Sequence, residues 1–298
     1  MNLIEQAARR LEELAQAGIG VPEKAVQQAV AAHARNVAGL REPRREPVLR
    51  EAPPARTAKL CNIDLARLQA NGFLTPNSSE SKLLHDFRVI KRPLILNAKG
   101  KTAGPVANGN LIMVTSSLPG EGKSFVSLNL AMSIAMEVDS RVLLVDADVL
   151  RPTIPRLLGI PPARGLMDVL TDPDTSIGDV LLRTNLDRLS LILAGTPRRD
   201  SSELLASDAM RQLVRELADR YPDRIIVFDS PPLLATTEPR ALATYMGQVV
   251  VVVEAERTTH ATLETALATV ENCPVVLTML NKAPESESGS YYGYGYGH

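Results

Sequence analysis

Aromatic side chains are scarce in this chain of 298 residues, which has no tryptophan, four phenylalanines and six tyrosines. Because 45% of the residues are hydrophobic but only 3% are aromatic, a core built from this sequence must be mainly aliphatic. The tail has the opposite character, since four of the six tyrosines lie in the last eight residues. They are Tyr291, Tyr292, Tyr294 and Tyr296.

Excess charge, cysteine and long apolar runs are also missing. The 33 basic and 34 acidic residues give a net charge of -1, which argues against binding of nucleic acid through bulk charge. Cys61 and Cys273 are far apart and lack metal-type spacing, so we expect two buried or unreactive thiols in a reducing cytoplasm. No membrane span is expected without a run of 18 apolar residues, and the early acidic residues argue against a secretory signal.

Composition divides the chain into four regions. Residues 1–34 carry two helical patterns, of which the first, over 2–18, is amphipathic. Residues 35–60 are rich in Arg and Pro and lack apolar periodicity, which is typical of a flexible linker; weak contact with anionic lipid is the alternative. We expect a folded domain over 61–284 and a Tyr-rich tail over 285–298.

Six short aliphatic runs in the third region predict β-strands. The runs are almost wholly apolar rather than alternating, which is typical of strands covered on both faces in a parallel sheet. Helical stretches between them would supply the crossovers, so we predict a doubly wound α/β domain with a mostly parallel sheet and a ligand site beyond the carboxyl ends of its strands. The predicted strands are 111–117, 141–147, 189–195, 224–230, 248–255 and 274–280, and the predicted helices are 81–95, 123–137, 202–220, 238–246 and 258–271.

A phosphate-binding loop follows the first of these runs. The sequence SLPGEGKS, which starts at Ser117, joins a predicted strand to a predicted helix, although the general pattern has glycine at that first position. Gly120 and Gly122 would let backbone N–H groups turn toward phosphate oxygens, and the helix N-terminus would attract the anion. Lys123 would reach the β and γ phosphates of ATP and the Ser124 hydroxyl would bind Mg²⁺. The predicted nucleotide-binding residues of this loop are Pro119, Gly120, Glu121, Gly122, Lys123, Ser124 and Phe125.

Three aspartates follow predicted strands at the same edge of the sheet. Asp146 and Asp148 lie at the end of the second run and directly after it, and Asp229 lies at the end of the fourth. Carboxylates at the mouth of an apolar strand are unfavourable unless a cation is near, which favours a Mg²⁺ site. A helix cap and a buried turn acid are the structural alternatives. The predicted catalytic residues are Lys123, Asp146, Asp148 and Asp229, and the predicted metal ligands are Ser124, Asp146 and Asp229.

The segments SSLPGEGKS, VLLVDADVLRP and IIVFDSPP resemble, in order and spacing, those of the bacterial protein-tyrosine kinases of polysaccharide export. Those kinases are phosphate-loop NTPases related to the MinD and ParA ATPases, and the resemblance covers about residues 80–298. It implies ATP and Mg²⁺ as cofactors and the four tail tyrosines as autophosphorylation sites. Asp146 would orient the incoming phenol or accept its proton. Asn281 matches a position that contacts adenine in related ATPases, with a strand-end turn as its alternative role.

The chain departs from its relatives at two places. Leu118-Pro119-Gly120 stands where the partitioning ATPases have a lysine in a KGG arrangement, which argues against that group. The kinases' assembly motif, Glu-x-x-Arg-x-x-Arg, reads His85, Arg88 and Lys91 here, which weakens the expectation of a ring-like oligomer. The N-terminal part resembles the subgroup encoded with exosortase-linked exopolysaccharide systems.

The resemblance also implies partners and a location. A separate membrane protein of the chain-length or polysaccharide co-polymerase type would activate the kinase at the cytoplasmic side of the inner membrane. The Tyr-rich tail would support self-association, a tyrosine phosphatase would act on it, and no nucleic acid is expected. Two other functions stay open: a MinD/ParA-like ATPase switch, and a nucleotide-binding adaptor that docks to a membrane protein through residues 2–18.

Overall fold

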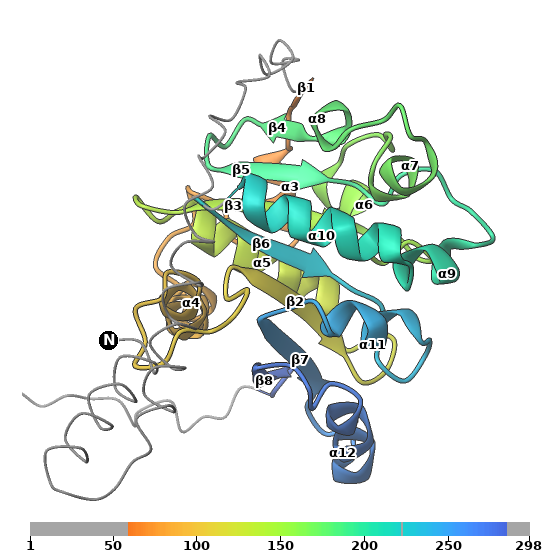
Figure 1. The fold of residues 1–298 in the computed structure, drawn as a ribbon. Helices are drawn as coiled ribbons and strands as arrows, with labels where there is room; N and C mark the ends of the chain where they lie inside the picture. Colours follow the sequence, from red (N-terminus) through yellow and green to blue (C-terminus); the bar gives the residue numbers. More distant parts are fainter. Residues whose placement is uncertain (1–58, 222, 285–298) are drawn as a thin grey trace, which may run out of the picture. The chain divides into compact units, whose positions relative to one another are not determined.

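A single sheet organises the part of the chain that the computed structural model describes, residues 59–221 and 223–284. Its strands are ordered β1-β4-β5-β3-β6-β2-β7-β8 (Figure 1). All neighbours are parallel except β4 and β5, so the prediction of a mostly parallel sheet is confirmed. The strands are β1 (Lys59–Cys61), β2 (Leu111–Ser116), β3 (Arg141–Asp146), β4 (Leu182–Thr184), β5 (Leu189–Ile192), β6 (Arg224–Asp229), β7 (Gln248–Glu254) and β8 (Val275–Asn281).

All six predicted strands are present, and β1 and β4 are the two that the sequence patterns missed. Each is only three residues long and lacks a continuous apolar run, so neither has the signal of a strand covered on both faces. The start predicted for the domain, residue 61, is the last residue of β1. The predicted helices of residues 1–34 and the four tail tyrosines lie outside the described residues.

Helices cover both faces of the sheet, with α10 on one face and α5 on the other (Figure 1). The helix predicted over 202–220 is divided into two, because Ser207 caps a new helix by accepting a hydrogen bond from the Met210 N–H at 3.3 Å. No helix among the described residues is long and apolar enough to cross a bilayer. The helices are α3 (Leu65–Ala70), α4 (Lys82–Ala98), α5 (Lys123–Ala135), α6 (Ile154–Leu158), α7 (Leu166–Thr171), α8 (Ile177–Val180), α9 (Ser201–Leu205), α10 (Asp208–Arg220), α11 (Glu238–Ala243) and α12 (His260–Ala268).

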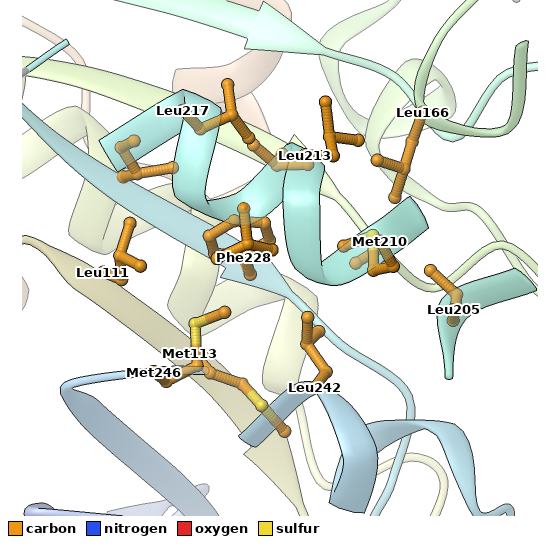
Figure 2. Close-up of a cluster of buried hydrophobic side chains, with 14 of the residues drawn as sticks. Leu111, Met113, Leu166, Leu205, Met210, Leu213, Leu217, Phe228, Leu242 and Met246 are labelled. Carbon is orange, nitrogen blue, oxygen red and sulfur yellow. The ribbon is translucent and has the colours of Figure 1, made fainter. Parts of the chain in front are cut away.

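Two hydrophobic clusters lie on opposite faces of the sheet. In the first, Phe228 of β6 packs with Met210, Leu213 and Leu217 of α10 (Figure 2). The second surrounds α5, whose residues from 126 to 134 are all buried. Both clusters are mainly aliphatic, as expected, and each fully buried side chain of this kind contributes on the order of 2 kcal/mol. The sheet is therefore a rigid support for the residues at its strand ends.

Lys91 of α4 is buried against α5 instead of facing outward. Its ammonium group donates to the Ser133 carbonyl at 2.7 Å and lies 2.6 Å from the Glu137 carboxylate. Of the three positions that match the assembly motif, only His85 and Arg88 are exposed, and Arg88 pairs with Glu80 at 3.0 Å. Lys91 thus has a structural role within this chain, because it joins α4 to the C-terminal end of α5.

Lys91→Met should lower the free energy of unfolding by about 1–3 kcal/mol, because the buried Ser133 carbonyl and the Glu137 carboxylate lose a charged donor. Urea denaturation measures the change. Arg92→Met is the matched control on an exposed position of the same helix and should stay within about 0.5 kcal/mol of the parent. An equal loss in both variants would mean that the buried ion pair is not the cause.

Candidate functional site

Three neighbouring strands, β3, β6 and β2, bring the predicted catalytic residues to one edge of the sheet. Asp146 and Asp229 end β3 and β6 and are directly paired in the register of the two strands. Asp148 follows β3 by two residues, and Lys123 opens α5 behind the loop that follows β2. The structure therefore brings all four predicted catalytic residues together, as parallel strands that end at one edge should.

Lys123 is the positive centre of this cluster. Its ammonium nitrogen lies 2.6 Å from Asp148 Oδ2 and 3.7 Å from Asp229 Oδ1, and it donates to Ser124 Oγ at 3.2 Å. Burial alone would lower the pKa of Lys123, but the charges of Asp229 and Asp148 outweigh it and raise the pKa above its ordinary value. Lys123 is consequently a fixed cation at this edge of the sheet.

Asp146 and Asp229 carry the buried negative charge of the site. Neither carboxylate oxygen of Asp146 has a well-formed hydrogen bond among the described residues, and the Asp148 N–H gives it only slight support. Burial, followed by the charge of Asp229, raises the pKa of Asp146 well above its ordinary value. Asp229 Oδ1 accepts from Ser127 Oγ at 3.0 Å, and Oδ2 has no well-formed hydrogen bond within the described part of the chain. Burial raises the pKa of Asp229 as well, against the lowering effect of Lys123, Ser124 and Ser127.

These unpartnered oxygens suit a divalent cation bound together with phosphate. No group of three or more His, Cys, Asp or Glu side chains within residues 59–221 and 223–284 could hold a metal ion by itself. Mg²⁺ in nucleotide enzymes usually takes one or two carboxylates and completes its shell with phosphates and water. The oxygens of Asp146, Asp229 and Ser124 beside the loop fit that requirement.

The loop before α5 has the backbone geometry of a phosphate cradle. Gly120 and Gly122 adopt φ values of +92° and +100°, which favour glycine. A Cβ atom on Gly122 would also lie 2.1 Å from Asn281 Nδ2, so a larger residue there would displace the Asn281 amide from the loop. Ser117 is not among the described residues with positive φ, which explains why serine is accepted at that position. The N-terminus of α5 has no side-chain cap, so its first N–H groups can bind phosphate.

Glu121 and Asn281 support the loop from inside. The Glu121 carboxylate is buried and accepts hydrogen bonds from the Leu118 N–H, at 2.7 Å, and from the Thr258 hydroxyl. The Asn281 amide donates to the Glu121 carbonyl at 2.8 Å. Both residues were predicted to bind nucleotide, and their contacts in the structure are with the loop itself and its neighbours.

A charged group beside the loop was missed by the sequence analysis. Lys282 donates to the Gly120 carbonyl at 2.8 Å and pairs with Glu254 at 3.1 Å, and Arg257 pairs with the same carboxylate at 2.9 Å. The sequence signal that could have revealed this group was the position of its residues at strand ends, since Glu254 ends β7 and Lys282 directly follows β8. The segment that leads into the tail is thus attached to the phosphate-binding loop.

A hollow of about 470 Å³ opens on the other side of the loop. Asp148 lines it, whereas Asp146 and Asp229 do not. Besides the loop, its walls come from the segment after β3, from α6, from the loop after β6 and from Phe73. The lining residues are Phe73, Pro119, Gly120, Gly122, Lys123, Ser124, Phe125, Asp148, Leu150, Arg151, Thr153, Arg156, Leu157, Pro231, Pro232, Ala235 and Thr236.

Known proteins with similar sequences and folds include several kinases. A family model described as "ParA: NUBPL iron-transfer P-loop NTPase" matches residues 108–193. Tyrosine-protein kinase YwqD of Bacillus subtilis is 31% identical over 186 residues, which are 61% of this chain and 76% of YwqD. Tyrosine-protein kinase ptk of Acinetobacter johnsonii is 33% identical over 61% of this chain, which spans only 25% of that longer relative. The kinase domain of the Escherichia coli tyrosine kinase ETK has a TM-score of 0.61 at 27% identity, covering 74% of this chain and 84% of that domain.

Asp146→Asn should stabilise the nucleotide-free protein at pH 7–8, by at least about 2 °C in unfolding temperature. A carboxylate whose pKa is raised by folding binds its proton more tightly in the folded state. The folded protein therefore loses stability as the pH rises from 3.8, the ordinary pKa of an aspartate, through the raised pKa of Asp146. The gain of the Asn variant should shrink toward pH 4. Thermal unfolding of both proteins across this range measures it, and parallel curves would contradict the buried-charge explanation.

Proposed function

Because the chain belongs to the family of bacterial tyrosine-protein kinases, we propose that it phosphorylates its own C-terminal tyrosines with ATP as the donor. Protein-tyrosine kinase is its enzyme class. The observation that carries the proposal is the contact of Lys123 with Asp148 and Asp229 beside the phosphate-binding loop. The tail follows β8, and Lys282 at its root contacts the same loop. The acceptors in this proposal are Tyr291, Tyr292, Tyr294 and Tyr296.

Transfer of the γ-phosphoryl group depends mostly on positioning and on neutralising charge, since its transition state is loose. Lys123 would exchange Asp148 for the β and γ phosphates, and the N–H groups of the loop and of the α5 N-terminus would hold the remaining phosphate oxygens. Ser124, Asp229 and Asp146 would hold Mg²⁺. When bound, the ion supplies neutralisation of the charge on the phosphate oxygens.

Asp148 is the carboxylate best placed to orient the phenol. The sequence analysis gave that task to Asp146, but Asp146 does not line the hollow and Asp148 does. The phosphates would draw Lys123 away from Asp148 and leave this carboxylate without its cation, beside the reacting oxygen. Since the phenol has a pKa near 10, Asp148 would accept its proton late in the transfer. In this mechanism Asp146 would help to hold Mg²⁺ and would not contact the phenol.

We further propose a role in exopolysaccharide synthesis and export, within the subgroup encoded with exosortase-linked systems. A separate membrane protein of the co-polymerase type would activate the kinase from the inner membrane, on its cytoplasmic side, and a tyrosine phosphatase would reset it. The motif order and the similarity to tyrosine-protein kinases support this proposal. The match of residues 108–193 to a ParA-type model favours an ATPase switch as the second candidate.

Lys123→Met should abolish tail phosphorylation, by at least about a hundredfold, because it removes the main protein cation from the transferred phosphate. Intact-mass measurement after incubation with Mg-ATP, followed by peptide mapping, gives the extent and the sites. Lys99→Met is the matched control, since Lys99 is an exposed lysine that bonds only to the Asp139 carbonyl among the described residues.

The same assay separates the candidate functions. Phosphotyrosine on the tail of the parent chain supports the kinase proposal. Phosphate release without phosphotyrosine would favour the ATPase switch, and nucleotide binding with neither product would favour an adaptor.

Phosphorylation of the tail should weaken the self-association of the chain, because each phosphotyrosine adds about -1.5 to -2 charges near neutral pH. An unmodified tail can occupy a neighbour's site as substrate, whereas a phosphorylated tail would be repelled by nucleotide phosphates. A variant with all four tail tyrosines changed to Glu should form particles of smaller mass in solution than the corresponding Phe variant. Light scattering at equal concentration with Mg-ADP measures this, and equal masses would refute the switch while leaving the kinase proposal intact.

A further inference from the structure

Strand β8 forms an edge of the sheet and is only partly covered on both of its faces. Within the described ranges its one strand neighbour is β7 (Figure 1). None of the seven residues of β8 is buried, whereas six of the seven residues of β7 are. Leu280 is 62% exposed, and Thr278 is exposed as well. A strand that is open at the edge of a sheet can accept a further strand through its free N–H and C=O groups.

The hydrogen bonds to β7 show which backbone groups of β8 are free. The Asn281 carbonyl accepts from the Ala255 N–H at 2.9 Å, so Asn281 directs its backbone toward β7. Because this direction alternates along a strand, Val276, Thr278 and Leu280 direct their N–H and C=O groups away from β7. Their side chains lie together on one face of the strand. The outer edge of β8 and one of its faces are therefore open at the same three residues.

The sequence of β8 lacks the features that usually prevent pairing at an edge. The strand reads VVLTMLN and contains no charged residue, proline or glycine. Proteins commonly protect an edge strand with such residues, with a very short strand, or with a segment that covers it. The side chains of β8 provide no such protection, and its length provides none either. This favours a segment that pairs with it.

We infer that residues 291–297 of the tail pair with β8 as an added antiparallel strand. Their sequence, YYGYGYG, alternates with the period of two that a strand requires, which places Tyr292, Tyr294 and Tyr296 on one face and glycines on the other. Tyrosine favours strands, and neither run carries a charge that would oppose pairing. The pairing goes beyond the proposed function and does not require kinase activity.

The chain leaves β8 in a direction that allows it to return along the edge. Lys282, the first residue after the strand, has a φ of +56°, so the chain turns there instead of continuing the strand. Residues 281–291 would form the connection. Since a short connection gives an effective concentration on the order of millimolar, the chain's own tail is favoured over that of a second copy. The expected pairs are Leu280 with Tyr292, Thr278 with Tyr294 and Val276 with Tyr296.

This pairing would be reversible, and it would control access to the tyrosines. Glycine at every second position weakens a strand, because it loses more backbone freedom and offers no side chain to pack. Where the proposed function holds, a tail on β8 is withdrawn from the phosphate-binding loop, so its release would precede phosphorylation. This consequence rests on the proposed function, whereas the pairing does not.

Disulfide trapping in the full chain tests the pairing. Leu280→Cys is combined with Tyr292→Cys, and Cys61→Ser removes the more accessible of the two native thiols. Opposed residues of an antiparallel pair have Cα atoms about 5.5 Å apart, which a disulfide can span. The matched control combines Leu280→Cys with Gly293→Cys, since a shift of one residue places the thiol on the other face. The first pair should form an intramolecular disulfide at least about tenfold faster than the control.

Thr278→Pro gives a second measurement. The Thr278 N–H faces away from β7, so proline removes a hydrogen bond that only the added strand would use. Trapping of the first cysteine pair should become at least about tenfold slower, while the unfolding temperature stays within about 3 °C of the parent. With the native tail, the same variant should phosphorylate its tail at least about threefold faster, because more of the tail is free. Thr278→Ser keeps the N–H and should change neither rate.

The possible results are distinguishable. Equal trapping of the two cysteine pairs would overturn the added strand, because an unpaired tail presents both positions alike. A disulfide that joins two chains would assign the edge to a second copy and overturn pairing within one chain. Selective trapping with an unchanged phosphorylation rate in Thr278→Pro would overturn the withdrawal of the tyrosines and leave the pairing intact. If the parent chain forms no phosphotyrosine, the proposed function fails, whereas the disulfide still decides the pairing.

Discussion

The pairing of Asp146 with Asp229 at the ends of two adjacent buried strands is the constraint on which the site depends. Two carboxylates side by side in an apolar environment repel each other and lose hydration, so a cation must be close. Lys123 supplies part of that charge, and the unpartnered oxygens of Asp146 and Asp229 leave room for more. In the proposed function, the same unfavourable arrangement of charge would favour the binding of Mg²⁺ and phosphate.

The phosphate-binding loop is fastened on one side and open on the other. Asn281 and Lys282 hold the backbone of Glu121 and Gly120, so the end of β8 and the root of the tail are attached to the cradle. On the opposite side the hollow leaves Asp148 accessible. Gly120, Gly122, Lys123 and Ser124 also line this hollow, so in the proposed function the phosphates and the acceptor would meet there.

Most of the fold was predictable because its signal is local. Six strands showed as apolar runs, since a strand covered on both faces must be apolar along its whole length. The two short strands β1 and β4 carry no such signal and form only because a neighbouring strand offers its edge. Lys91 is a further example: the sequence showed only a weak match to the assembly motif, whereas burial against α5 gave it a partner that lies 46 residues away, Glu137.

The sequence by itself determined the fold class, and it predicted the phosphate-binding loop and the charged residues that the structure brings together, because spacing and residue type carry these signals. Only the tertiary structure decided how those residues share their work. Asp146 and Asp148 are separated by a single residue, yet Asp148 lines the hollow, whereas Asp146 does not and pairs with Asp229 in the sheet. A strand would place residues i and i+2 on the same face, but β3 ends at Asp146, so only the path of the chain beyond the strand decides that Asp148 lines the hollow.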